Sequence, residues 1–185
     1  MSWEFSSGSL TGKRALVTAL PSAPRDGDEC VLADSLTAPT WSWLLRYVAA
    51  KASNKWAFIG GLPFREAVSG TSTATGNGTA LGTGLVLPAA GNYDVHFGGL
   101  LTRATPTEWL YVYLKAGNGT LFTTIIAWLR TTTDTDSHLT LSSASPLNGM
   151  AAGATVKLYL ANSNGTSQVG VTEGFLRITP AAIGG

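Results

Sequence analysis

The feature that most constrains the fold is a succession of short apolar runs separated by turn dipeptides. Asn-Gly pairs begin at Asn77, Asn118, Asn148 and Asn164, each where one apolar run stops and another is due. Such pairs tolerate φ > 0 and join neighbouring antiparallel strands. No helical pattern of useful length occurs in the sequence. The chain is therefore expected to be all-β, with about eight strands after residue 63 forming an antiparallel sandwich or barrel.

The sequence changes character near residue 63. Residues 62–83 become rich in Gly, Ser and Thr, which is typical of a connector or an irregular first strand. We expect a small β module at 1–63, with strands at 29–33, 41–48 and 55–59. We expect a sandwich domain at 64–185, with strands at 80–87, 93–101, 108–115, 121–130, 138–142, 155–161 and 169–178, and a further one at 64–68.

The upstream module carries more aromatic residues than it can bury. Period-two alternation puts four large side chains on one face of its second strand: Trp41, Trp43, Leu45 and Tyr47. Trp56 and Phe58 likewise point together in the third. A unit of about 50 residues has too small a core for all of these rings. The module is therefore expected to dock on the downstream domain or on another protein.

One hairpin is predicted in detail. If Asn118-Gly119 forms a type I′ turn, four cross-strand pairs follow: Lys115 with Phe122, Tyr113 with Thr124, Tyr111 with Ile126, and Trp109 with Trp128. The opposite side of this ribbon is aliphatic and suits a core. A sheet that packs on one side only should have a polar second side, and this ribbon has an aromatic one.

The aromatic side of the hairpin has three interpretations. It is the sandwich interior, with the module covering the aliphatic side; or it is a subunit interface; or it is a platform that stacks on sugars. Each ring can bury on the order of 150 Å² or more, so the whole face left in water would approach or exceed the few hundred Å² typical of the largest patch on a monomer. The candidate interface residues are Trp109, Tyr111, Tyr113, Phe122, Ile126 and Trp128.

Composition favours an assembled protein. Charged residues make up only 12% of the 185 residues, so the chain must hide surface to remain soluble. A net charge of +1 provides no attraction to nucleic acid or to a membrane surface. Cys30 is the only cysteine, which suggests folding in a reducing cytoplasm. We expect no secretory signal and no membrane insertion.

No pattern of catalytic residues is visible. Nucleophile elbows, phosphate-binding Gly-Lys loops, His-Glu-x-x-His and Cys-x-x-Cys motifs are all missing from the sequence. Asp134 and Asp136 suit a solvated loop, with Ca²⁺ binding as the alternative. His96 and Asp94 alternate on one strand face and are interpreted as a surface pair. We therefore predict a protein that is not an enzyme and has no cofactor and no metal site; a hydrolase on a β scaffold is the remaining alternative.

Residues 20–63 resemble a short β module of minor tail and other structural proteins of tailed bacteriophages. The likeness rests on Leu20-Pro21-x-x-Pro24-x-Asp26-Gly27-x-Glu29, then Leu45-Arg46-Tyr47, then Lys55-Trp56-x-Phe58-x-Gly60-Gly61-x-Pro63. The resemblance implies a module that attaches to a virion. Its candidate attachment residues are Trp43, Arg46, Tyr47, Lys55, Trp56 and Phe58.

From about residue 80 the chain resembles the jelly-roll heads of the tumour necrosis factor and complement C1q class, which also tip phage fibres. Residues 86–97, with Pro88, Gly91 and Tyr93, are similar to the entry into the third strand of that class. Residues 147–158 and 175–178 are similar to its last two strands. This resemblance implies a TNF/C1q-like jelly roll and a homotrimer.

Together these features predict a virion protein assembled in the host cytoplasm, in the tail fibre, tail tip or head decoration. Its expected partners are copies of itself, other virion proteins and a host cell-surface glycan. The alternative is a carbohydrate-binding module that uses exposed aromatic residues.

Overall fold

The structure is a computed structural model that describes residues 14–103, 110–116, 121–129, 136–142, 147–163, 165 and 168–184. These residues contain strands and no helix. The strands are β1 (Ala15–Val17), β2 (Glu29–Ala33), β3 (Ser42–Tyr47), β4 (Trp56–Leu62), β5 (Phe64–Ser72), β6 (Thr79–Val86), β7 (Gly91–Arg103), β8 (Leu110–Ala116), β9 (Leu121–Leu129), β10 (Asp136–Ser142), β11 (Leu147–Met150), β12 (Thr155–Asn162) and β13 (Val169–Ile183). The prediction of an all-β chain is confirmed.

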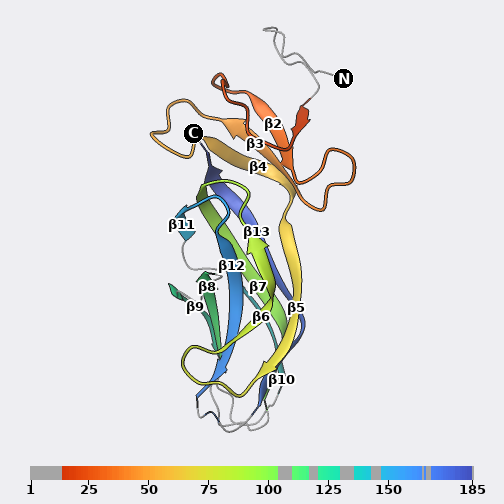
Figure 1. Cartoon of the computed structure of the whole chain (residues 1–185), viewed down its shortest axis with the longest axis vertical. Helices are drawn as coiled ribbons and strands as arrows, with labels where there is room; N and C mark the ends of the chain where they lie inside the picture. The colour runs from red at the N-terminus through yellow and green to blue at the C-terminus, as the bar shows by residue number, and fades with distance from the viewer. Residues whose placement is uncertain are drawn as a thin grey trace.

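The strands form two sheets in a sandwich-like arrangement. A nine-stranded sheet has the order β1-β2-β3-β4-β13-β7-β10, with β5 also paired to β13 and β11 also paired to β7. A four-stranded sheet has the order β6-β12-β8-β9. All described pairs are antiparallel except β1–β2, which is parallel and belongs to the N-terminal section, so the described pairs of the sandwich are antiparallel as expected. Figure 1 shows β2, β3 and β4 at one end of an elongated molecule and the two-layered body at the other.

Alternating burial explains why these segments pair as they do. In β12, Val156, Leu158 and Leu160 are buried completely, whereas the residues between them are partly exposed. The same alternation runs along β7 and β13, the central strands of the other sheet. Because side chains alternate across a strand, each sheet turns one apolar face toward the other and leaves one face outside.

The predicted strands all occur, and two further short ones do as well. The unpredicted strands are β1, of three residues, and β11, of four. In β11, Gly149 has φ +64° and the register with β7 shifts. Asn148-Gly149 is therefore a bulge inside a strand, which the sequence pattern could not separate from a turn. The predicted turn at Asn77-Gly78 is present, with Gly78 at φ +70°.

The predicted register of the β8–β9 hairpin is wrong. The observed partners are Trp128 for Tyr111, Ile125 for Tyr113 and Leu121 for Lys115. The register shifts between these pairs because β9 contributes more residues than the stretch of β8 that it pairs with. A prediction from one two-residue turn assumes a constant register, and bulges break that assumption. The turn itself, at Asn118-Gly119, lies outside the described residues.

The two predicted sections share one sheet. Pro63 alone separates β4 from β5, and both strands lie along the same edge of β13. The end of β13 pairs with β4 through Ile183 and Trp56, and its earlier part pairs with β5. The N-terminal strands β1–β4 therefore extend the sheet of the sandwich beyond its body (Figure 1).

Candidate functional site

The aliphatic side of β8 faces the sandwich interior. Leu110, Val112 and Leu114 have no exposed surface, whereas Tyr111 and Tyr113 between them are partly exposed. The interpretation that the aromatic side forms the interior is therefore wrong for β8. Its tyrosines lie on the outer face of the four-stranded sheet.

Three tyrosines gather on this outer face. The rings of Tyr111 and Tyr113 lie 5.9 Å apart with an interplanar angle of 14°. Tyr159 of β12 is the cross-strand partner of Tyr113, and it is likewise partly exposed. Burial, and secondarily the neighbouring Tyr111, raises the pKa of Tyr113. We call Tyr111, Tyr113 and Tyr159 the tyrosine cluster.

A lysine that sequence analysis did not select closes one end of the tyrosine cluster. Lys115 is only 2% exposed, and its Nζ lies 5.3 Å from the ring centroid of Tyr113 and 4.7 Å from that of Tyr159. The same Nζ donates a hydrogen bond to the backbone oxygen of Asn77. Burial lowers the pKa of Lys115. Alternation alone places Lys115 beside the tyrosines, but nothing in the sequence indicates that Asn77 would cover it.

The structure places only part of the predicted hairpin interface. Tyr111 and Tyr113 come together as described above. Trp109 lies outside the described residues, and Phe122, Ile126 and Trp128 belong to β9, whose backbone is described and whose side chains are not. In the backbone ladder, Trp128 lies directly opposite Tyr111.

The predicted attachment residues of the N-terminal strands fall into two groups. Trp43 and Trp56 are buried, and Trp43 reaches the ring of Tyr93 in β7 at 6.1 Å. Its Nε1 has no hydrogen-bond partner among the described residues. The Trp-rich face is thus used inside the molecule, where it joins the N-terminal strands to the sandwich.

The remaining predicted attachment residues reach the surface. Tyr47 is partly exposed and packs edge-on against Trp56, with centroids 5.3 Å apart. Phe58 is partly buried against the core, and Lys55 is partly exposed. Arg46 is the most open of the set, with 54% of its side chain exposed.

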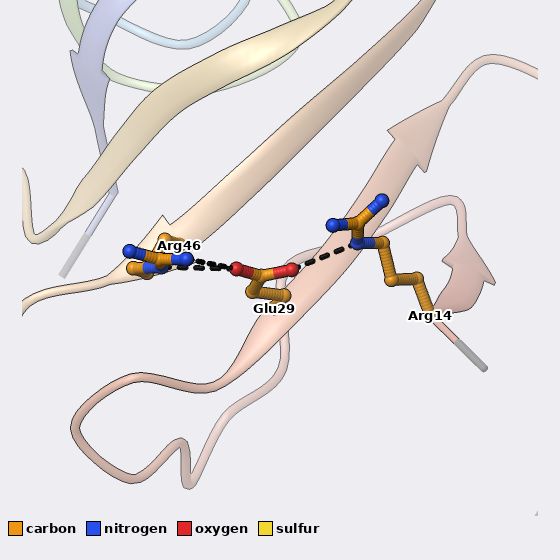
Figure 2. Close-up of polar contacts among 3 residues, drawn as sticks. All are labelled: Arg14, Glu29 and Arg46. Carbon is orange, nitrogen blue, oxygen red and sulfur yellow. Dashed lines mark hydrogen bonds and ion pairs between the residues drawn. The ribbon is translucent and has the colours of Figure 1, made fainter. Parts of the chain in front are cut away.

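Arg46 belongs to a three-residue ion network on the N-terminal strands (Figure 2). Glu29 of β2 accepts hydrogen bonds from Arg46 of β3 at 2.5 and 2.9 Å and from Nε of Arg14 at 2.8 Å. These bonds, first from Arg46 and then from Arg14, lower the pKa of Glu29. Because all three residues are close to solvent, the network orders side chains more than it stabilises the fold.

An aliphatic row runs beside this network. Cys30 and Leu32 of β2 are buried, so Val31 between them points outward. The Cα register places Leu16, Val31, Leu44 and Gly60 side by side across β1, β2, β3 and β4.

Exposed large hydrophobic residues concentrate around this row. Among the described residues they are Leu16, Leu36, Ile59, Leu62 and Val86, and all but Val86 belong to residues 14–63. We call Leu16, Val31, Leu44 and Ile59 the aliphatic face.

The titratable side chains that could bind a metal or react lie apart from one another in the part of the chain that the structure describes. They contain no group of three His, Cys, Asp or Glu side chains that could hold a metal ion. Cys30 is buried, and burial raises its pKa to about 11, so the thiol is inert. Burial and then Arg177 lower the pKa of His96, while Asp94 raises it. Asp134 lies outside the described residues, and Asp136 begins β10.

No helix among the described residues is long and apolar enough to cross a membrane. No protein-family model matches the sequence, and no curated protein matches it.

Proposed function

We propose that the two-layered body is a jelly roll of the TNF/C1q class. The support is its strand order: β5-β13-β7-β10 in one layer and β6-β12-β8-β9 in the other. Consecutive strands along the chain alternate between the layers at β5 to β6, β6 to β7 and β7 to β8, and again at β12 to β13. Such crossings are expected of a jelly roll, in which a folded-over ribbon supplies both sheets.

We further propose that the chain is a structural protein of a tailed-bacteriophage particle. The observation that carries this proposal is the pairing of two different outward faces on one continuous framework. The aliphatic face lies on β1–β4 and the tyrosine cluster lies on the four-stranded sheet. Exposed apolar side chains of this extent mark sites that contact other proteins.

In this proposal the aliphatic face attaches the chain to other virion proteins. Its side chains come from four neighbouring strands, so they extend across one side of the sheet formed by β1–β4. The buried Trp43 fixes the orientation of these strands relative to the sandwich. Arg46, at the border of the face, supplies a charge at the rim of the contact, as is common for interfaces.

The sandwich, for its part, joins copies of the chain into a trimer through the tyrosine cluster. Tyrosine is enriched at protein interfaces because it combines a large apolar ring with a hydroxyl group. Lys115 is already covered by Asn77, so its charge is not newly desolvated when a copy docks.

Electron microscopy of assembled particles tests the proposal. Antibody fragments raised against the chain should decorate a symmetric site on tail or head, and they should not label particles that lack the chain. Particles that are complete without it and carry no label would contradict a structural role.

A carbohydrate-binding module is the second candidate, because the Tyr111 and Tyr113 rings are nearly parallel and partly exposed. Rings in this arrangement can stack on the apolar faces of sugars. Glycan-array binding that Tyr111→Ala abolishes would favour this candidate. A tyrosine cluster covered by a second copy in solution would exclude it.

A further inference from the structure

Sheet geometry aligns three basic residues across the outer face of the nine-stranded sheet. Arg65 of β5 is the cross-strand partner of Arg177 of β13, and Arg177 is the partner of His96 of β7. The three strands lie side by side (Figure 1). Leu176 and Ile178 are fully buried, so Arg177 between them points outward. Neighbouring strands are about 4.8 Å apart, which keeps the row compact.

Like charges in directly opposite positions destabilise a sheet, so this arrangement needs a compensating feature. Among the described residues, neither Arg65 nor Arg177 forms an ion pair. The Nε of Arg177 is buried and has no hydrogen-bond partner among them. A buried donor without a partner costs stability, so the placement of Arg177 is unfavourable in the isolated chain.

A neighbouring aromatic ring holds the guanidinium of Arg65 in place. The guanidinium of Arg65 lies 4.9 Å from the ring centroid of Phe175, which precedes Arg177 by two residues on the same face. Asp94 is the nearest acidic residue along β7, and its effect on the pKa of His96 is smaller than that of Arg177. Because burial and Arg177 lower the pKa of His96, the positive charge of the row near neutral pH comes from Arg65 and Arg177.

Hydroxyl groups continue this face beyond the basic row. Ser69 and Thr71 are exposed on β5, and Thr102 of β7 lies within reach of the same surface. A Cβ placed on Gly170 would meet both Thr102 and Thr71, which shows that these two side chains flank one spot on the outer face. Guanidinium groups recognise carboxylates in a planar, bidentate manner, and hydroxyls pair with hydroxyls.

We propose that Arg65 and Arg177 bind the carboxylates of an acidic polysaccharide on the outer face of β5, β13 and β7. Charge complementarity selects the carboxylate, and the hydroxyls of Ser69, Thr71 and Thr102 farther along the same strands suit an extended saccharide as its carrier. The proposal deepens the proposed function, because an outward-facing particle protein meets the glycans of its host. It places that contact on the sheet opposite the tyrosine cluster.

Binding of the full chain to polygalacturonate, measured by calorimetry against neutral dextran, tests the proposal. Wild type should bind the polyuronate and not dextran. Arg65→Gln and Arg177→Gln should each weaken binding by about 10- to 100-fold, as expected for the loss of a charge-assisted hydrogen bond. Arg65→Lys, which keeps the charge but not the bidentate geometry, should fall between them and wild type.

Arg25→Gln is the matched control. Arg25 is exposed, and its substitution removes the same charge at a position far along the chain from the row of Arg65, Arg177 and His96. Equal losses in Arg25→Gln and Arg65→Gln would overturn the proposal, since binding would then depend on net charge alone. Failure of wild type to bind at low salt would also overturn it. So would dissociation of an oligomer by Arg65→Gln, because the row would then lie between copies. Particle labelling is independent of each of these results, so the site and the proposed function can fail separately.

Discussion

The two outward faces differ in chemistry although they belong to one framework. The aliphatic face has branched side chains that stand open to solvent, such as Ile59 at 42% exposed. The tyrosine cluster has rings that are partly covered by one another and by Lys115. The charged residues beside the two faces differ as well. Next to the aliphatic face, Glu29 is paired with two arginines near solvent. Next to the tyrosine cluster, Lys115 is buried against the backbone oxygen of Asn77 and two tyrosine rings. The difference fits the two contacts proposed above, one through apolar side chains with Arg46 at its rim and one through rings that carry hydroxyls.

The separate roles proposed for the aliphatic face and the tyrosine cluster depend on the N-terminal strands keeping a fixed position on the sandwich. Trp43→Ala would remove the fully buried ring that contacts Tyr93, and we expect it to destabilise the chain by about 3–5 kcal/mol. Denaturant unfolding measures this loss. Leu44→Ala, next to it but on the outer face, is the control and should cost far less. A small loss for Trp43→Ala would show that the two regions are not coupled through this ring.

Two double variants should distinguish the role of the tyrosine cluster from that of the aliphatic face. Tyr111→Ser with Tyr113→Ser should convert the proposed trimer to monomer at micromolar concentration and leave the N-terminal strands able to attach. Leu16→Ser with Ile59→Ser should keep the trimer and abolish incorporation into particles. Mass in native solution and particle composition measure the two effects. If one variant abolished both properties, the separation of roles would be wrong.

Buried Lys115, at the end of the tyrosine cluster, should make the stability of the chain depend on pH. Because burial lowers the pKa of Lys115 in the folded chain, the unfolded chain binds more protons in the window just below the ordinary value of 10.5. The contribution of Lys115 to stability should therefore increase as pH rises through that window.

Lys115→Met keeps most of the volume and removes the charge, so it should remove this increase while folding normally. The free energy of unfolding, measured from pH 8 to pH 10.5 for wild type and for Lys115→Met, checks this expectation. Equal pH dependence in both would show that Lys115 is not the group responsible.

The ion network should have the smallest effect. Glu29→Gln removes the acceptor shared by Arg14 and Arg46, and the expected loss of stability is slight and shrinks further at high salt. Since the pKa of Glu29 is lowered in the folded chain, its contribution is present above the ordinary value of 4.5 and is lost as pH falls below it. Unfolding midpoints at low and high salt measure this, and a large salt-independent loss would contradict a solvent-screened network.

Local patterns predicted the strands and, for β3, the buried side, but they left the core side of the β8–β9 hairpin open and did not predict the contacts between segments far apart in the chain. Period-two alternation identified the buried face of Trp41, Trp43 and Leu45, because side-chain direction along a strand is a local property. The register of β8 and β9 was not predictable, because bulges depend on both strands at once. The covering of Lys115 by Asn77 and the row of Arg65, Arg177 and His96 depend on strand order, which no single segment encodes.

The candidate site was predicted in part for the same reason. Tyr111 and Tyr113 were identified because they alternate with Leu110, Val112 and Leu114 in one strand. The aliphatic face was not identified, because its residues come from four strands and none of these is strongly apolar on its outer side. Trp43 and Trp56 were proposed for attachment, and the structure buries both rings, with Trp43 in contact with Tyr93 of the sandwich.

Sedimentation velocity of the unmodified full chain tests whether other copies of the chain cover the tyrosine cluster, as proposed. If the chain forms the proposed trimer, we expect a single species at low micromolar concentration with three times the 19.2 kDa mass of the chain. A stable 19.2 kDa monomer over that concentration range would contradict it.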